Sequence, residues 1–392
     1  MYQCGFQPQK AEKNMKKLIS SEHYLLPCRL DNWIRLLSQN GFHIRPGRIP
    51  QALWISLVSL VLSPFALAEA LIYGKRIKET KIEKGPLFVI GHWRSGTTYL
   101  QNVLSRDPQF GWFDPVHTTT FSNSLLLGWL VGPPQRKLLK NARPMDNLKY
   151  GLDLPMEEVF AQANISTNAI IQMLTFPRLY RRYFEAAFVT TLPEKEQRDW
   201  FRSYRYIIKK MTYACGGRTL ILKSPDNTCR AGLLLKEYPG AKFINIHREP
   251  YVTIMSTINM FRIETDVFSL NDPPEGDYQE MMEDAIIEIF ERMYRGLFAL
   301  EGELPKGVIY DIAYDDFVRD PVGSLKDIYG ELGIDGFEDA RPRFESYIES
   351  LGHYKKNHFE LYERLRKKIN AKLGFYFEHY GYEMRTEEIE EN

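Results

Sequence analysis

Short apolar runs of strand length alternate with longer helical periodicities along the central part of the chain. The runs cover residues 87–90, 219–222, 243–246 and 308–312, and residues with helical periodicity follow each of them. Apolar runs of four or five residues bounded by turn signals are typical of buried parallel strands. The pattern therefore predicts an α/β fold, in which helices flank a parallel β-sheet.

Helical periodicity dominates residues 121–214, where prolines punctuate the pattern. We interpret residues 115–215 as a helical insertion in a domain that covers residues 85–392. Residues 1–84 form a helical region before this domain, and the two parts are expected to make one structural unit.

The stretch 49–74 is strongly apolar and carries one charge, Glu69. Pro64 divides it, so we predict a helical hairpin that belongs to the core or covers a pocket. An amphipathic helix in a membrane surface and a membrane span are the alternatives. Basic residues flank the stretch on both sides: Arg45, Arg48, Lys75, Arg76 and Lys78.

The charge balance gives the chain no global attraction for polyanions. Its 51 Lys and Arg residues and 50 Asp and Glu residues leave a formal net charge of +1, so no nucleic-acid partner is expected. The four cysteines form no C-x-x-C pair, which argues against a zinc site or a disulfide scaffold. The first forty residues lack the apolar core of a signal peptide. We expect a cytoplasmic protein, with a position at the inner face of a membrane as the alternative. The oligomeric state is not predicted.

A glycine-hinged loop joins the run 87–90 to a helical pattern that opens at Thr97. Such a loop aims backbone N–H groups and the positive end of a helix dipole at one point, which suits an oxyanion. The spacing Gly91-x4-Gly96 is that of a P-loop, but Thr97 stands where a P-loop carries its lysine. The cation lies inside the loop, at Arg94. A P-loop kinase or NTPase is therefore disfavoured.

A second strand also ends in a cation. The run 243–246 leads to Arg248, and Pro250 is well placed to begin a helix that contains Ser256. With both segments considered, the chain resembles the sulfotransferases that use 3′-phosphoadenosine 5′-phosphosulfate (PAPS). In that family an Arg/Lys-x-Gly-Thr-Thr loop binds the 5′-phosphosulfate, and an arginine with a serine eight residues later binds the 3′-phosphate. The matching residues here are Arg94, Ser95, Gly96, Thr97 and Thr98 for the first motif, and Arg248 and Ser256 for the second.

The resemblance implies the three-layer, P-loop NTPase-like fold of sulfotransferases. It also implies transfer of a sulfuryl group from PAPS to an acceptor hydroxyl, which leaves adenosine 3′,5′-bisphosphate (PAP). Arg94 would contact the bridging and leaving oxygens, while Lys223, at the end of the run 219–222, would reach the sulfuryl group. A surface-exposed role for Lys223 is the alternative. The resemblance also assigns a basic segment that closes over the nucleotide to Tyr354, Lys355 and Lys356. The migrating group carries one negative charge, so no metal is required.

The general base is the point at which the chain departs from the simplest family pattern. Cytosolic members use a histidine two residues after the strand-end lysine, whereas this chain has Pro225 there and Asp226 next. Other members use a glutamate from the helical region. Glu157 and Glu158 are predicted in the first turn of a helix, where only one of them can face the site. We choose Glu157 and keep Glu158 and Asp226 as alternatives.

The acceptor is predicted to be a small, lipid-like molecule. Apolar residues around Leu53 and in the segment 125–130 would suit a hydrophobic alcohol such as a sterol or lipid if they line one cavity. A saccharide or glycolipid acceptor is the alternative. Two functions of other classes compete with sulfotransfer: a P-loop kinase or NTPase, and a non-catalytic, membrane-apposed binding protein.

Overall fold

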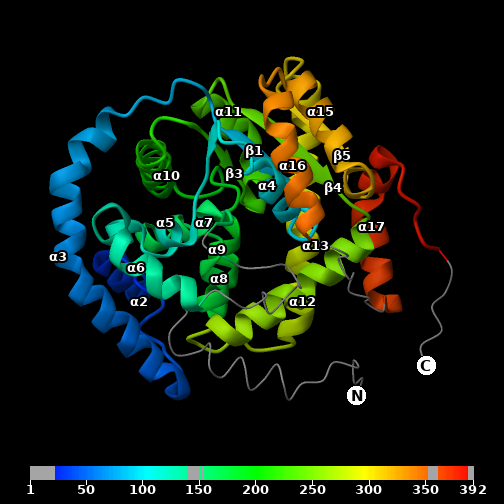
Figure 1. The fold of residues 1–392 in the computed structure, drawn as a ribbon. Coiled ribbons are helices and arrows are strands. Elements are labelled where there is room, and N and C mark those ends of the chain that lie inside the picture. Colours follow the sequence, from blue (N-terminus) through cyan, green and yellow to red (C-terminus); the bar gives the residue numbers. More distant parts are fainter. Residues whose placement is uncertain (1–22, 139–150, 152, 352–360, 387–392) are drawn as a thin grey trace.

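A computed structural model describes residues 23–138, 151, 153–351 and 361–386 of the chain. Its centre is a five-stranded sheet with the order β2-β3-β1-β4-β5, in which every neighbouring pair is parallel (Figure 1). This confirms the predicted α/β fold. The strands are β1 (Leu87–Ile90), β2 (Phe110–Gly111), β3 (Thr219–Leu222), β4 (Lys242–His247) and β5 (Ile309–Ala313).

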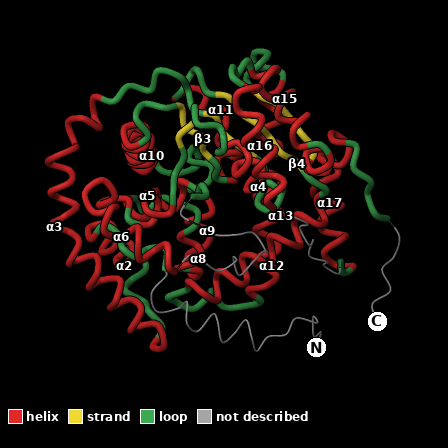
Figure 2. The backbone as a smooth tube through the Cα atoms, viewed as in Figure 1, coloured by secondary structure: helices red, strands yellow, loops and turns green. Residues whose placement is uncertain are grey.

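Helices surround the sheet and fill the connections (Figure 2). Those before β3 are α2 (Leu30–Gln39), α3 (Ile49–Glu79), α4 (Thr97–Leu104), α5 (Pro115–Thr119), α6 (Ser124–Leu138), α7 (Glu158–Ile165), α8 (Gln172–Thr175), α9 (Tyr180–Glu185) and α10 (Glu194–Ala214). Those after β3 are α11 (Ala231–Glu237), α12 (Pro250–Phe268), α13 (Tyr278–Glu301), α14 (Tyr314–Arg319), α15 (Pro321–Leu332), α16 (Phe337–Leu351) and α17 (Glu363–Tyr380). Short 3-10 helices cover Pro46–Arg48, Phe121–Asn123, Pro177–Leu179 and Pro225–Arg230.

The central strand β1 is fully buried and feeds two separate cores. Because successive side chains of a strand point to opposite faces, Leu87 and Val89 join one apolar cluster, while Phe88 and Ile90 join the other. The first cluster includes residues of α4, α15 and α16, and the second includes residues of α10, α13 and α17. The result is a three-layer arrangement of helices, sheet and helices.

The helical insertion lies between the long helix α3 and the sheet, as Figure 1 shows. Within residues 121–138 and 153–214, the predicted helical character is confirmed by the helices from α6 to α10. Helix α10 contacts both α3 and β3, and so joins the insertion to the sheet.

The hairpin predicted for residues 49–74 is wrong, because α3 is one helix of 31 residues with Pro64 in its interior. A proline removes one helical hydrogen bond and disfavours the straight helix. Contacts on both sides of Pro64 hold the helix to the protein and offset this cost. Before the proline, Trp33 Nε1 donates to Ser56 Oγ at 2.8 Å, and after it the buried Glu69 forms an ion pair with Lys210 of α10.

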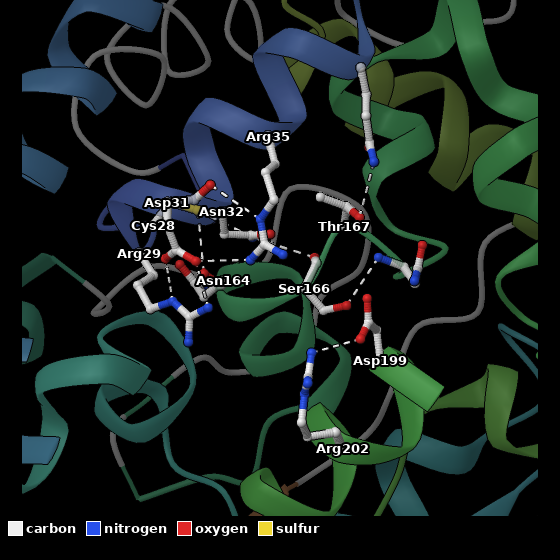
Figure 3. Close-up of polar contacts among 12 residues, drawn as sticks. Cys28, Arg29, Asp31, Asn32, Arg35, Asn164, Ser166, Thr167, Asp199 and Arg202 are labelled. Carbon is white, nitrogen blue, oxygen red and sulfur yellow. Dashed lines mark hydrogen bonds and ion pairs between the residues drawn. The ribbon is translucent and has the colours of Figure 1, made fainter. Parts of the chain in front are cut away.

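The N-terminal part of the chain packs into the same core as the sheet. Buried side chains of Tyr24, Trp33 and Ile55 belong to one apolar cluster with Phe88 of β1. Polar contacts add to this packing: the Asn32 amide donates to the backbone oxygen of Ala163 at 2.9 Å and to that of Ser166 at 3.4 Å. Figure 3 shows Asn32 beside Ser166. At the surface, Asp31 forms ion pairs with its neighbours Arg29 and Arg35.

Candidate active site

The loops that follow three neighbouring strands meet at one edge of the sheet. Arg94 follows β1, Lys223 follows β3 and Arg248 follows β4. Since all the strands are parallel, these residues lie at carboxyl ends, where ligands bind in open α/β sheets. Three cations thus come from segments that are far apart in the sequence.

The loop after β1 has a backbone that its glycines make possible. Gly91 and Gly96 have φ angles of 135° and 110°, which side chains disfavour. A Cβ atom on Gly91 would lie 2.3 Å from the backbone oxygen of Ile246, and one on Gly96 would lie 2.4 Å from the Tyr314 ring. Arg94 adopts a left-handed conformation at φ 68°. The loop is therefore packed tightly between the ends of β4 and β5.

Ser95 and Thr228 fix the turn of this loop. The Ser95 backbone N–H and hydroxyl both donate to the His92 oxygen, at 3.2 and 2.8 Å, and the Gly91 N–H donates to Thr228 Oγ1 at 2.8 Å. Helix α4 then begins at Thr97. The first N–H groups of a helix have no intrahelical acceptor, so those at Thr97 and Thr98 suit an anionic group.

The two predicted cofactor-binding segments are in direct contact. Arg94 Nε donates to Ser256 Oγ at 3.0 Å, and Arg248 Nη1 donates to the Arg94 backbone oxygen at 3.4 Å. The Arg248 guanidinium lies over the Tyr314 ring, 4.3 Å from its centroid. In helix α12, Ser256 is placed by an N-cap: the Glu249 carboxylate accepts the Val252 N–H at 2.8 Å.

Lys223 connects the loop to a carboxylate of the insertion. Its ammonium donates to Thr98 Oγ1 at 3.2 Å and forms an ion pair with Glu157. The Lys223 side chain is only 1% exposed, which rules out the surface-exposed alternative. Glu157 was predicted to lie in the first turn of a helix. It is instead the N-cap residue of α7, one position before the helix begins.

Glu158 points away from this pair into the protein. It is buried, accepts a hydrogen bond from the Tyr204 hydroxyl at 3.1 Å, and also accepts one from the Asn227 amide. Burial raises the pKa of Glu158 above its usual range. The two adjacent carboxylates thus occupy different surroundings, as expected for neighbours on a helix.

A profile of the Sulfotransferase family matches residues 86–339, which is more than half of the chain. The chain belongs to the sulfotransferase family. This membership makes it an enzyme and sets aside both the kinase or NTPase and the non-catalytic binding protein. Members of the family generally use PAPS as the sulfuryl donor.

Sulfotransferases of mycobacteria are among the proteins that resemble the chain. Omega-hydroxy-beta-dihydromenaquinone-9 sulfotransferase Stf3 of Mycobacterium tuberculosis is 29% identical over 362 residues, and the match covers 92% of each chain. The crystal structure of sulfotransferase STF9 from Mycobacterium avium matches with a TM-score of 0.67 and 16% identity over 99% of this chain and 100% of that one. Sulfotransferase STF1 from Mycobacterium tuberculosis gives a TM-score of 0.56 and 16% identity over 93% and 99% of the two chains. The two crystal structures support the sulfotransferase fold.

Asp226 of this sulfotransferase belongs to a buried polar network. Its carboxylate forms an ion pair with Arg230 at 2.8 Å and accepts a hydrogen bond from Ser224. The Arg230 guanidinium lies 4.7 Å from the centroid of the Trp200 ring and donates to the Asn227 side chain at 2.9 Å. Asp226 and Glu158 thus both make buried polar contacts that hold neighbouring segments of the protein together. Glu157, 16% exposed, remains at the Lys223 pair.

Some neighbours of the sulfotransferase site had no assigned role in the sequence prediction. Tyr314 packs against Gly96 and under Arg248, and its position at the end of β5 was the available signal. The contacts of Tyr204 and Asn227 with Glu158 have no sequence signal, because they depend on how α10 and the 3-10 helix Pro225–Arg230 pack against α7. His92 is fully buried, and this burial lowers its pKa to about 3.

Two groups of residues that were predicted to belong to the site are not found in it. The basic segment with Tyr354, Lys355 and Lys356 lies outside the described residues. Leu53 of α3 and Leu130 of α6 were expected to line an acceptor cavity, but their side chains are 64% and 55% exposed and face outward. Within the described ranges, no three His, Cys, Asp or Glu side chains gather to hold a metal ion.

Proposed function

We propose that this sulfotransferase transfers the sulfuryl group of PAPS to the hydroxyl of a hydrophobic, lipid-like alcohol. The observation that carries the proposal is the connected set of Glu157, Lys223 and Thr98, which joins a carboxylate and a buried ammonium to the anion-binding loop. The neighbouring contact of Arg94 with Ser256 supports it.

Binding of the donor uses two anion sites, one for each end of PAPS that carries a phosphate. The backbone N–H groups and hydroxyls of Thr97 and Thr98 hold the 5′-phosphosulfate at the start of α4. Arg248 and Ser256 hold the 3′-phosphate, for which the guanidinium fork is well suited. Arg94, which contacts Ser256 and carries the Arg248 contact, lies between these two anion sites.

The transfer step balances as an in-line displacement at sulfur. The acceptor oxygen forms a bond to sulfur while the bond from sulfur to the 5′-phosphate oxygen breaks, and PAP leaves. Glu157 takes the proton from the acceptor hydroxyl. Lys223 and Arg94 stabilise negative charge on the sulfuryl and leaving oxygens, which is the usual role of cations fixed in such sites. No divalent metal is required, because the migrating group carries one negative charge.

The hydrophobic acceptor is supported by the relative Stf3, whose name gives omega-hydroxy-beta-dihydromenaquinone-9 as its substrate. That name describes a hydroxylated, apolar compound. No observation on this chain favours the saccharide or glycolipid alternative, so the lipid-like alcohol is the acceptor class that we propose.

Thermal unfolding with two nucleotides tests the donor. PAP is expected to raise the melting temperature of the protein, and ATP with magnesium is expected to leave it nearly unchanged, because the loop has Thr97 in place of a P-loop lysine. As a control variant, Arg319→Ala removes an exposed arginine of α14 and should still be stabilised by PAP. Stabilisation by ATP with magnesium alone would overturn the proposal.

A further inference from the structure

The outward face of α3 is a broad apolar surface. Its exposed large side chains recur three and four residues apart, which places them on one side of the helix. They are Ile49, Leu53, Trp54, Leu57, Leu60, Val61, Phe65, Leu67, Leu71 and Ile72. Helix α3 runs along one side of the molecule (Figure 1), and exposed apolar patches of this kind usually mark an interaction site.

Helix α6 extends this surface. The buried Glu69 carboxylate of α3 accepts the N–H groups of Leu125 and Leu126 at 2.8 and 2.9 Å, so the start of α6 is fixed against α3. One turn further along α6, Trp129 and Leu130 expose 76% and 55% of their surface. We call these two residues and the exposed side chains of α3 the apolar face.

The opposite side of α3 is attached to the protein near both ends of the helix and, through Ser56 and Glu69, between them. Near its N-terminus, Arg48 Nη2 donates to the Asp266 backbone oxygen at 2.6 Å, and near its C-terminus the Lys78 backbone oxygen accepts from Lys209 at 2.8 Å. Helix α3 is long and apolar enough to cross a membrane by length and composition. Its lengthwise attachment instead suits a helix that lies in the plane of a membrane surface.

Charge distribution favours an anionic lipid surface as the partner. From residue 49 to residue 74 the only charged side chain is Glu69, and it is 1% exposed and paired with Lys210. Lys75 and Lys78 follow Leu57 and Leu60 by eighteen residues, which is five helical turns, and so continue the same side of the helix. Both lysines are exposed.

We propose that the apolar face binds in the plane of an anionic lipid bilayer, with the lysines at the end of α3 on lipid headgroups. Tryptophans such as Trp54 and Trp129 suit this boundary, where one part of the ring is apolar and the indole N–H is wet. The proposal goes beyond the transfer reaction and does not depend on it. It places the enzyme at a membrane surface, where a lipid acceptor would be found.

Co-sedimentation with vesicles tests the proposal. The wild-type protein is expected to bind phosphatidylcholine vesicles that contain phosphatidylglycerol. The double variant Leu57→Glu/Leu71→Glu should lower the partition coefficient more than roughly tenfold, because two apolar side chains lose their burial in lipid. The matched control Val318→Glu places the same charge on a 39%-exposed apolar position of α14, away from the apolar face, and should bind like wild type.

A second pair of variants tests the charge. Lys75→Gln/Lys78→Gln should weaken binding to the anionic vesicles by roughly fivefold per lysine and leave the weaker binding to pure phosphatidylcholine unchanged. An unchanged melting temperature and retained PAP stabilisation would show that each variant is folded, whatever happens to vesicle binding.

Three results would overturn the proposal. The first is wild-type protein that stays in the supernatant with both kinds of vesicle. The second is an equal loss of binding in Val318→Glu and in the double variant. The third is a wild-type dimer in sedimentation velocity that Leu57→Glu/Leu71→Glu converts to a monomer without any vesicle binding, since a second copy of the chain would then cover the apolar face.

Discussion

Substitution of Glu157 by glutamine separates its role as a base from its role in packing. The glutamine keeps the size of the side chain and an oxygen that can accept from Lys223, but it cannot take a proton at neutral pH. The Lys223 contact with Thr98, at 3.2 Å, does not involve the changed group. The donor site should therefore survive the change.

The expected loss is in turnover. A positioned general base contributes on the order of a hundredfold to ten-thousandfold, and a hundredfold loss corresponds to about 2.7 kcal/mol of the activation barrier. Lys223 is 1% exposed and loses its charged partner, so the free energy of unfolding should also fall, by on the order of 1–3 kcal/mol. The loss stays at this level because the glutamine oxygen can still accept a hydrogen bond from Lys223. The affinity for PAP should change less than about threefold, which is under 0.7 kcal/mol.

Steady-state transfer from radiolabelled PAPS and calorimetric titration with PAP measure the two quantities. Glu237→Gln is the matched control, because Glu237 is 18% exposed, close to the 16% of Glu157, and forms an ion pair with Arg205 away from the site. Normal turnover in Glu157→Gln, with a large loss in Glu158→Gln or Asp226→Asn, would refute the reasoning and place the base in the buried network.

Three further predictions concern the cations. Arg94→Ala should lower turnover about a hundredfold or more without loss of the fold, and retention of a tenth of the activity would contradict its role. Arg248→Ala should weaken binding of PAPS far more than binding of adenosine 5′-phosphosulfate, which lacks the 3′-phosphate; equal losses in titration would show that Arg248 is assigned wrongly. Burial lowers the pKa of Lys210 from 10.5 to about 8. Between these values the unfolded state binds a proton that the folded state has released, so this lysine makes the unfolding free energy rise with pH. In urea unfolding, Lys210→Met should remove this rise of the unfolding free energy with pH. If the unfolding free energies of wild type and Lys210→Met change equally with pH, Lys210 is not the cause of the rise.

The strands and the anion-binding loop could be predicted because their signals are local. A buried parallel strand is a short apolar run, and the loop after β1 needs glycine where φ is 135° or 110°. The spacing from Arg248 to Ser256 is likewise local, because Arg248 lies just before α12, which contains Ser256. The structure places Ser256 Oγ 3.0 Å from Arg94 Nε. The two-residue strand β2 was not predicted, because a pairing so short leaves no periodic pattern.

The remaining parts of the site depend on contacts between distant segments. The ion pair of Lys223 with Glu157 joins residues 66 positions apart, and no local pattern decides which carboxylate reaches the lysine. The continuity of α3 through Pro64 could not be predicted from a local pattern either. Pro64 suggested a break, whereas packing against α2 and α10 on both sides of the proline keeps the helix continuous.

Transfer of radiolabel from PAPS to a panel of alcohols tests the central claim most directly. The panel should contain isoprenoid and sterol alcohols beside mono- and oligosaccharides, with chelator present to remove divalent metals. We predict labelled lipid sulfate and equimolar PAP, with no labelled sugar and no effect of the chelator. Label confined to the saccharides, or transfer that stops when the chelator is added, would contradict the account.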